Sequence, residues 1–196
     1  MTSFKKRLVK VMNERTWKSA QLVTAAYMGI GGCGMNMLES WLKYLPTSAC
    51  TVAVNRDSTR LKEATGIQQH IFLAELSATN HQGQVMASIK EHMGELEAMV
   101  QRQDVIFLLA GLGGATGTWA SQFLCDQFLS MGKQVVMVLV MPFSFECKRV
   151  TLAEEALAGF DGMAHRVLCY NDYLIRHAPE GTSMTDAFEL LGMSDG

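Results

Sequence analysis

Short apolar segments alternate along the chain with longer segments in which apolar residues recur every three or four positions. Apolar runs of strand length lie at residues 22–28, 50–54, 104–109, 135–141 and 166–170. Segments with helical periodicity lie between or after them, at residues 36–45, 84–103, 119–131 and 150–158. Because these strands lack a polar face, they predict a sheet that is covered on both sides. The expected fold class is α/β, a three-layer, Rossmann-like, mainly parallel sheet with helices on both faces.

The beginning of the chain differs from the rest because it is polar and basic. Residues 5–19 combine basic side chains such as Lys6 and Lys10 with a few apolar ones, which predicts a solvated or domain-packing helix. The remaining sequence contains neither internal repeats nor a low-complexity linker. We therefore expect a basic helical extension at residues 1–21 and one α/β domain at residues 22–196.

Composition and charge restrict the class of protein. Of the 196 residues, 48% are hydrophobic and 18% are charged, which is typical of a globular α/β domain. The formal net charge of −2 gives no reason to expect a nucleic-acid partner. No apolar run is long enough to span a membrane, and the chain does not begin like a signal peptide. Five cysteines without a CxxC pair favour the reducing cytoplasm, and the five histidines lack metal-ligand spacing.

Two glycine-rich segments follow predicted strands. Residues 29–36 read Gly-Ile-Gly-Gly-Cys-Gly-Met-Asn, and residues 110–118 read Ala-Gly-Leu-Gly-Gly-Ala-Thr-Gly-Thr. A glycine-rich turn between a strand and a helix lets backbone N–H groups approach an anion, and the helix N-terminus adds partial positive charge. Thr116 and Thr118 add hydroxyl donors. One such segment is weak evidence for a nucleotide site, but two in one sheet strengthen it.

Polar side chains follow the other predicted strands. Asn55 and Asp57 come after the second strand, residues 142–149 follow the most apolar strand, and Asn171 and Asp172 follow the last one. Loops at the carboxyl ends of parallel strands converge on one crevice. Each pair also has a simpler interpretation, because Asn and Asp commonly cap turns and Glu146 with Arg149 has the spacing of a surface ion pair.

In this order, the segments resemble the nucleotide-binding domain of the FtsZ/tubulin family of self-assembling GTPases. Residues 29–36 are similar to its first glycine loop, and residues 53–57 to its AVNTD segment. Residues 113–119 match its GGGTGTG signature, with Ala115 and Trp119 in place of glycines. Residues 142–149 resemble PFNFEGKKR and are one residue shorter. Asn171-Asp172 and Asp186-Ala187-Phe188 resemble the paired ND and DAF segments, so the resemblance covers about residues 22–192.

The resemblance implies a binding site for GTP or GDP. Mg²⁺ is a candidate to bind with the nucleotide, and no residue is assigned as its ligand. Glu146 and Arg149 would face the ribose, Asn171 and Asp172 (or Asp186) would bind guanine, and Phe188 would stack on it. The nucleotide-binding residues expected on this basis are Gly31, Gly32, Gly34, Asn36, Asn55, Asp57, Gly111, Gly113, Gly114, Ala115, Thr116, Gly117, Thr118, Pro142, Glu146, Arg149, Asn171, Asp172 and Phe188.

Three departures from the family pattern bear on activity. Residues 76–83 correspond to the loop that senses the γ-phosphate and contain one glycine, which questions triphosphate discrimination. Trp119 would fill a pocket, contact a partner or obstruct the phosphates. The sequence ends at Gly196, before the family's activation domain with its acidic NxDxxD loop. We therefore expect no self-catalysed hydrolysis and name no catalytic residue.

Three functions compete at this point. The first is an FtsZ-like, guanine-nucleotide-binding protein of the cell-division cytoskeleton that self-associates or acts with a protein partner, such as a full-length FtsZ-like protein. The second is a scaffold that binds no nucleotide, its crevice plugged by Trp119 and Met35. The third is a dinucleotide-dependent oxidoreductase, based on residues 29–34 alone. It leaves the second glycine segment unexplained and places Asn55 where an acidic residue is expected.

Overall fold

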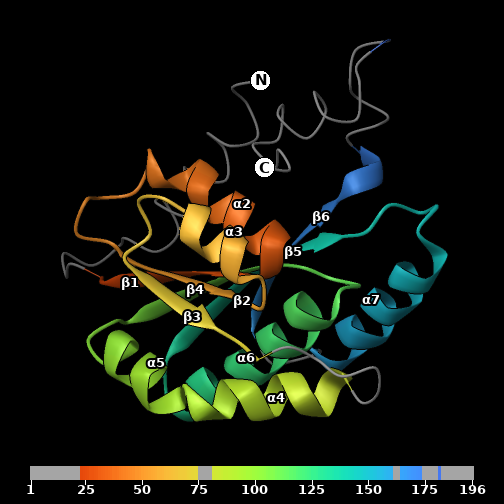
Figure 1. Cartoon of the computed structure of the whole chain (residues 1–196). Helices are drawn as coiled ribbons and strands as arrows, with labels where there is room; N and C mark the ends of the chain where they lie inside the picture. The colour runs from red at the N-terminus through yellow and green to blue at the C-terminus, as the bar shows by residue number, and fades with distance from the viewer. Residues whose placement is uncertain (1–22, 75–80, 161–163, 174–180, 182–196) are drawn as a thin grey trace.

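The computed structural model describes residues 23–74, 81–160, 164–173 and 181, and within them the chain forms a six-stranded parallel sheet (Figure 1). The strand order is β3-β2-β1-β4-β5-β6. The strands are β1 (Ala25–Ile30), β2 (Cys50–Asn55), β3 (Gln69–Phe72), β4 (Val105–Gly111), β5 (Gln134–Met141) and β6 (His165–Tyr170). Every pair of neighbouring strands is parallel, which confirms the expected α/β class. The predicted basic extension at residues 1–21 lies outside the described residues.

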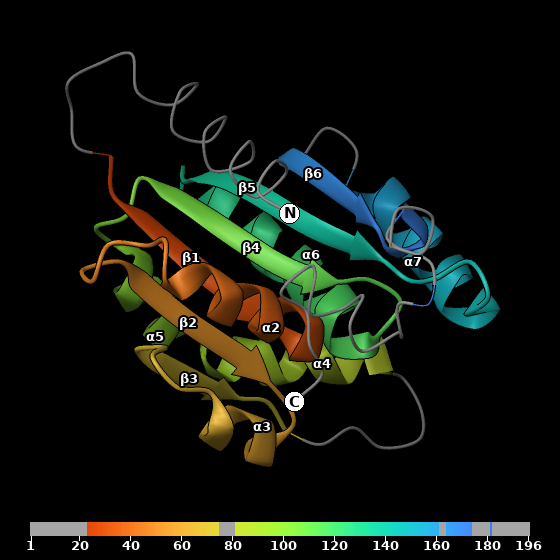
Figure 2. The same ribbon diagram turned by 90° about the horizontal axis from the view of Figure 1, so that it is seen from above.

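Helices cover both faces of the sheet, as Figures 1 and 2 show. One face carries α2 (Gly31–Leu42) and α3 (Ser58–Glu63). The opposite face carries α4 (His81–Glu91), α5 (Met93–Val100), the π-helical turn η1 (Thr116–Ala120), α6 (Ser121–Ser130) and α7 (Cys147–Gly159). None of the helices in the described part of the chain combines the length and the apolar character that crossing a membrane requires.

The central strands are apolar on both faces because both faces are covered. In β4, Ile106 and Leu108 belong to the core on the side of α4 and α6, whereas Phe107 and Leu109 belong to the core under α2. These four side chains are at most 8% exposed. This two-sided burial is the physical reason that the strands are continuous apolar runs instead of alternating ones.

The first glycine segment is part of a helix, so the loop expected before residue 36 is wrong. Helix α2 begins at Gly31, directly after β1, and Gly31 has a φ of +69°, a conformation that favours glycine. A Cβ on Gly34 would lie 2.1 Å from the carbonyl oxygen of Leu109, so only glycine lets α2 lie this close to β4. The glycines therefore bring the helix start onto the centre of the sheet.

Other elements also differ from the sequence prediction. The single helix expected at residues 84–103 is two helices, because the backbone leaves the helical conformation at His92 (φ −99°, ψ 1°). Ile89 and Leu96 are both fully buried and keep a helical spacing across this break, so the apolar periodicity does not reveal it. Strand β3 and helix α3 were not predicted. Both are short, and β3 buries Ile71 alone, so neither carries a periodic signal.

Candidate functional site

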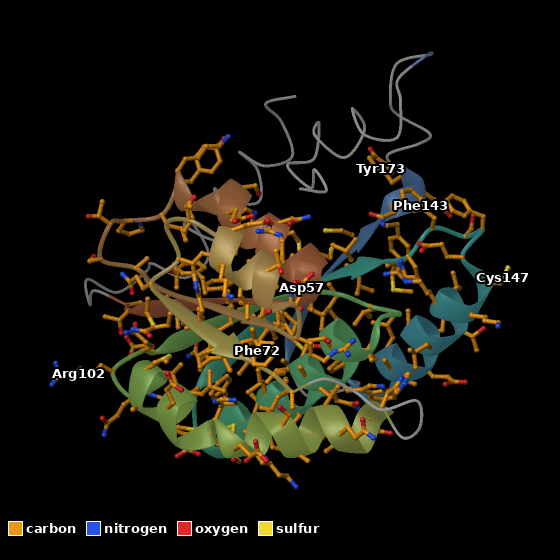
Figure 3. All side chains as sticks on the ribbon, viewed as in Figure 1. Asp57, Phe72, Arg102, Phe143, Cys147 and Tyr173 are labelled. Atoms are coloured by element: carbon orange, nitrogen blue, oxygen red, sulfur yellow. The ribbon has the colours of Figure 1, made fainter. Side chains whose placement is uncertain are left out.

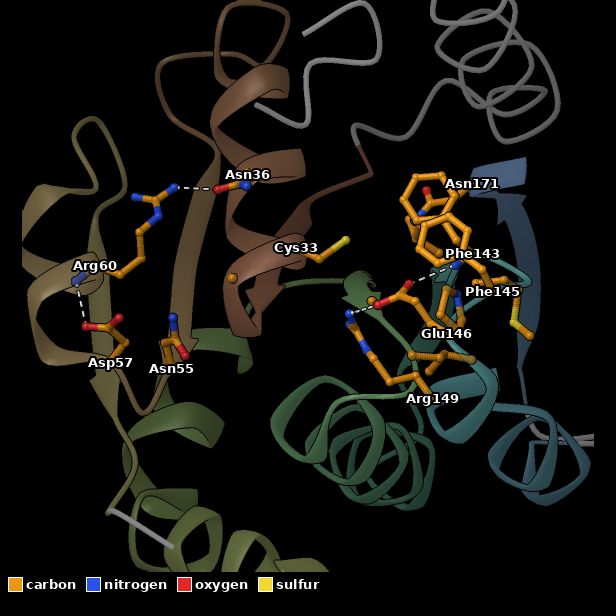
Figure 4. Close-up of a pocket in the computed structure, with 16 residues that line it drawn as sticks. Cys33, Asn36, Asn55, Asp57, Arg60, Phe143, Phe145, Glu146, Arg149 and Asn171 are labelled. Carbon is orange, nitrogen blue, oxygen red and sulfur yellow. Dashed lines mark hydrogen bonds and ion pairs between the residues drawn. The ribbon is translucent and has the colours of Figure 1, made fainter. Parts of the chain in front are cut away.

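The carboxyl ends of the strands surround a cavity of about 620 Å³, a size in the usual range for small-molecule sites (Figure 4). Asn36, Asp57 and Arg60 lie on one side of it, and Phe143, Glu146 and Asn171 on the other. The expected site residues on its wall are Gly32, Asn36, Asn55, Asp57, Gly111, Pro142, Glu146, Arg149 and Asn171. The sheet edge thus brings together residues from five separate segments of the chain.

Other expected residues lie behind or beside this wall. They are Gly31, Gly34, Gly113, Gly114, Ala115, Thr116, Gly117, Thr118 and Asp172. Phe188, like Asp186, lies outside the described residues. Sequence reasoning did not select Cys33 or Arg60, which both line the cavity. Cys33 stands inside the first glycine segment, which was a usable signal, whereas nothing in the sequence around Arg60 indicates its position.

The glycines divide into those that allow close packing and those that leave space. A Cβ on Gly117 would lie 2.1 Å from the carbonyl oxygen of Gly111, and one on Gly113, at φ +85°, would lie 2.6 Å from that of Arg149. Gly32 and Gly114 are different, because a Cβ there would meet no atom within 4 Å. Gly32 therefore leaves space in the cavity at the beginning of α2. Gly113 lets the signature turn approach α7, and Gly117 lets it pack against the end of β4.

Ala115, which replaces a glycine of the signature turn, causes no backbone strain. Ala115 has a φ of −57°, a normal right-handed conformation, so it fits without a glycine. The hydroxyl oxygen of Thr118, a fully buried residue, accepts a hydrogen bond of 3.0 Å from the backbone N–H of Gly113. The turn is therefore stabilised internally by one of the two threonines that the sequence suggested as anion donors.

The cavity is not plugged by the two residues named in the scaffold hypothesis. Trp119 is half-buried and packs against the core on the side of α4 and α6, and it does not line the cavity. Met35 is fully buried, does not line the cavity, and contacts the amide nitrogen of Asn55 through its sulfur at 3.3 Å. The proposed plugging of the crevice is therefore wrong.

Arg60 connects α3 to α2 along one wall. One of its terminal nitrogens donates to the side-chain oxygen of Asn36 at 2.6 Å, and its guanidinium also binds both carboxylate oxygens of Glu39. The hydrogen bond to Glu39 raises the pKa of Arg60 above its usual value. Because the donor is a guanidinium, the acceptor on Asn36 must be its oxygen. The amide NH₂ of Asn36 is left to donate.

Asn55 and Asp57 perform the capping roles that were considered for them. Asp57 accepts hydrogen bonds from the backbone N–H groups of Thr59 and Arg60, at 2.9 and 3.0 Å, at the beginning of α3. The side-chain oxygen of Asn55 accepts from the N–H of Arg56 at 2.8 Å. Both residues line the cavity as well, so capping fixes their positions at its edge.

The opposite wall is organised by Glu146. Its carboxylate accepts a hydrogen bond from the backbone N–H of Phe143 at 2.9 Å and forms a 2.5 Å ion pair with Arg149. The rings of Phe143 and Phe145 stack with their centroids 5.1 Å apart and their planes 8° apart. Phe145 is 65% exposed, so this wall presents an open aromatic surface beside a carboxylate and a guanidinium (Figure 4).

Asn171 and Asp172, the two residues after β6, have different positions relative to the cavity. Asn171 lines the cavity and is 9% exposed. Asp172 lies outside the wall, where its carboxylate accepts from the backbone N–H of Ser144 at 3.0 Å. This bond ties the end of β6 to the segment after β5, so Asp172 serves a turn in this structure and its contact with a base stays a prediction. In the described part of the chain, no three His, Cys, Asp or Glu side chains lie together as metal ligands would.

Comparisons with known proteins agree with this architecture. The profile of the Tubulin/FtsZ family, GTPase domain, matches residues 25–178. The chain therefore belongs to the tubulin/FtsZ family, and the matched part is its GTPase domain.

The individual relatives share about 30% of their residues with this chain. Cell division protein FtsZ 1 of Pyrococcus abyssi is 30% identical over 159 residues, which is 78% of this chain and 43% of that protein. FtsZ of Wigglesworthia glossinidia brevipalpis is 29% identical over 171 residues, or 82% of this chain and 44% of that protein. The chain thus spans less than half the length of these relatives.

Solved structures show the same fold at lower identity. An empty FtsZ dimer from M. jannaschii superposes with a TM-score of 0.76 and 24% identity, and the match covers 98% of this chain and 56% of that one. The GDP-bound monomer of CetZ1 from Haloferax volcanii gives a TM-score of 0.73 at 19% identity, with 87% and 57% covered.

Proposed function

We propose that this chain binds a guanine nucleotide in the cavity at the carboxyl edge of its sheet. One observation carries the proposal. In a member of the tubulin/FtsZ family, a cavity of about 620 Å³ lies between the glycine start of α2 on one side and the Glu146–Arg149 pair on the other. Backbone N–H groups at a helix start suit phosphates. Carboxylate and guanidinium groups suit ribose hydroxyls, and the exposed ring of Phe145 offers a stacking surface.

The partner and the biological role belong to the same proposal. We infer that the nucleotide controls association with a second copy or with another FtsZ-like protein, in cell division or a related cytoskeletal process. Hydrolysis of GTP would then appear when such a partner brings an acidic loop to the cavity. The reducing cytoplasm stays the proposed compartment, since the sequence has five cysteines and no CxxC pair.

Calorimetric titration of the purified chain with GTP, GDP and ATP, with and without Mg²⁺, tests the proposal. We expect saturable binding of both guanine nucleotides and none of ATP. Failure to bind GTP and GDP up to millimolar concentrations would leave a scaffold that works by protein contacts. Equal binding of ATP would overturn the guanine assignment.

Alkylation of Cys33 locates the binding site. Its thiol lies at the centre of the cavity, so a bound nucleotide should slow its reaction with N-ethylmaleimide (Figure 4). The experiment uses a Cys147→Ser background, because Cys147 is exposed and lies outside the cavity. Cys125 serves as an internal control: it is fully buried, and desolvation with the nearby Asp126 raises its pKa to about 11, so little reactive thiolate forms. Equal labelling with and without GTP would place the nucleotide elsewhere.

A further inference from the structure

Arg56 occupies an unusual place at the carboxyl end of β2. Its backbone N–H is bound by the side chain of Asn55, and its Nε donates a hydrogen bond of 2.8 Å to the hydroxyl oxygen of Thr116. Thr116 is 6% exposed and begins the π-helical turn η1, 60 residues further along the chain. The side chain of Arg56 therefore extends from the end of one strand to the start of the signature turn.

The rest of the guanidinium is not engaged. Both terminal NH₂ groups of Arg56 form no hydrogen bond and no ion pair with the described residues, whereas Arg60 and Arg149 are each paired with a glutamate. Among these three arginines, Arg56 is thus the one whose positive charge has no acidic partner in the described part of the chain. Its position is fixed through Nε, so four N–H donors remain in a planar arrangement.

The contact with Thr116 brings Arg56 next to the two glycine-rich segments. A Cβ on Gly31 would lie 3.8 Å from the Cβ of Thr116 and 3.4 Å from the backbone nitrogen of Gly117, so the start of α2 adjoins the start of η1. Gly32, the next residue of α2, lines the cavity. Arg56 itself does not line the cavity, but Asn55 and Asp57 on either side of it do, and its contact with Thr116 brings its side chain to where the glycine segment and the signature turn meet. This is where the proposed nucleotide would place its phosphates.

The two carboxylates at the cavity already accept hydrogen bonds within the chain, and those to Asp57 use only one of its oxygens. Asp57 accepts from two backbone N–H groups, and Glu146 accepts from a backbone N–H and pairs with Arg149. A divalent cation on a nucleotide commonly takes one or two carboxylates together with phosphate oxygens. Guanidinium groups match phosphate oxygens in charge and geometry, and the resulting hydrogen bonds are charge-assisted.

We propose that Arg56 binds the phosphates of the nucleotide directly and supplies part of the charge neutralisation that a divalent cation otherwise gives. This inference rests on the proposed function. Its consequence is that the affinity for GTP depends little on Mg²⁺. Replacing Arg56 alone should make that affinity depend on Mg²⁺. Arg56→Thr introduces the residue of the AVNTD segment that residues 53–57 resemble, so it removes the charge and adds a hydroxyl.

Calorimetry with GTP in excess Mg²⁺ and in EDTA tests the proposal on the wild type, Arg56→Thr and Arg102→Ala. Arg102 is an exposed arginine that lies far from Asp57 (Figure 3) and does not line the cavity. We expect Arg56→Thr to weaken GTP binding about tenfold or more in EDTA and about threefold or less in Mg²⁺. The wild type and Arg102→Ala should change about threefold or less between the two buffers.

Two results would contradict the inference, and they are distinguishable. If Arg56→Thr weakens binding equally in both buffers, or not at all, Arg56 supports the turn and does not replace a cation, while the nucleotide proposal stands. Thermal melting of the free variants measures such a structural role separately. If the wild type binds no guanine nucleotide in either buffer, the proposed function fails, and this inference fails with it.

Discussion

Arg60 and Asn36, which come from two different helices, are joined by a 2.6 Å hydrogen bond at the cavity wall. The bond fixes the side-chain oxygen of Asn36 and leaves its NH₂ group as a donor. Arg60 is held in turn by Glu39. The contact with Arg60 therefore fixes the orientation of the Asn36 amide, whose NH₂ group can donate to a ligand.

Replacing Arg60 with Gln should lower the affinity for guanine nucleotide by about three- to tenfold, since Asn36 loses its orientation. Stability should fall by about 1 kcal/mol or less, because both members of the Arg60–Glu39 pair are partly exposed. Calorimetric titration and urea unfolding measure the two effects, with Arg102→Gln as the control. Unchanged affinity would mean that Asn36 does not contact the nucleotide.

Gly32 and Gly34 form a matched pair on α2. Gly34→Ala should destabilise the fold by about 3 kcal/mol or more, because its Cβ would lie 2.1 Å from the carbonyl oxygen of Leu109. Gly32→Ala should leave stability unchanged or raise it by up to about 1 kcal/mol, since alanine favours helix. It should nevertheless weaken nucleotide binding, because the new methyl group enters the cavity wall. Equal loss of stability in both variants would contradict this division.

Trp119 should contribute to stability and not to ligand selection. Trp119→Ala is expected to lower the free energy of unfolding by about 1–3 kcal/mol, below the value for a fully buried aromatic residue because Trp119 is half-buried. Trp119→Phe should recover most of this loss. Nucleotide affinity should not change in either variant, and an increase would indicate that the indole obstructs the phosphates after all.

Asp104 provides a pH-dependent contribution to stability. Its carboxylate accepts from the backbone N–H of Thr24 at 2.8 Å and from the Thr24 hydroxyl at 3.0 Å, and these bonds lower its pKa. A pKa lower in the folded chain than in the unfolded chain stabilises the fold above the unfolded value of about 3.9. This stabilisation is lost as the pH falls through the lower, folded value.

The urea midpoint of Asp104→Asn should therefore lie below that of the wild type at neutral pH. The difference should shrink as the pH falls from about 4, the pKa of the unfolded carboxylate, towards the lower pKa of the folded one. Glu97→Gln, which changes an exposed carboxylate on α5, is the control and should show no comparable trend. A difference that does not depend on pH would contradict the role of the charge.

The sequence predicted the sheet because its strands are apolar on both faces. It did not predict β3 or α3, since an edge strand that buries Ile71 alone and a six-residue helix lack a periodic pattern. The helix break at His92 was also missed, because Ile89 and Leu96 keep their spacing across it. The apolar pattern thus predicted which segments are strands and which are helices. It did not predict where each element begins or ends, because those positions depend on local backbone conformation.

At the candidate site, the sequence identified segments better than individual roles. It placed Asn36, Glu146 and Asn171 at one crevice, and the structure brings them to one cavity. It did not find Arg60, because that position depends on how α3 packs beside α2. It also could not separate Gly32 from Gly34, since the distinction lies in the distance to Leu109, a residue on another strand.

The placement of β1 between β2 and β4 has a consequence for synthesis on the ribosome. Residue pairing between β1 and β4 joins Ala25 to Val105, so the first 100 residues lack the strand against which Gly34 lies. Long-range parallel pairing is slow because a large loop must close first. The start of α2 therefore cannot reach its final place until β4 has been synthesised. A nascent chain that stops before β4 should expose apolar surface and require a chaperone.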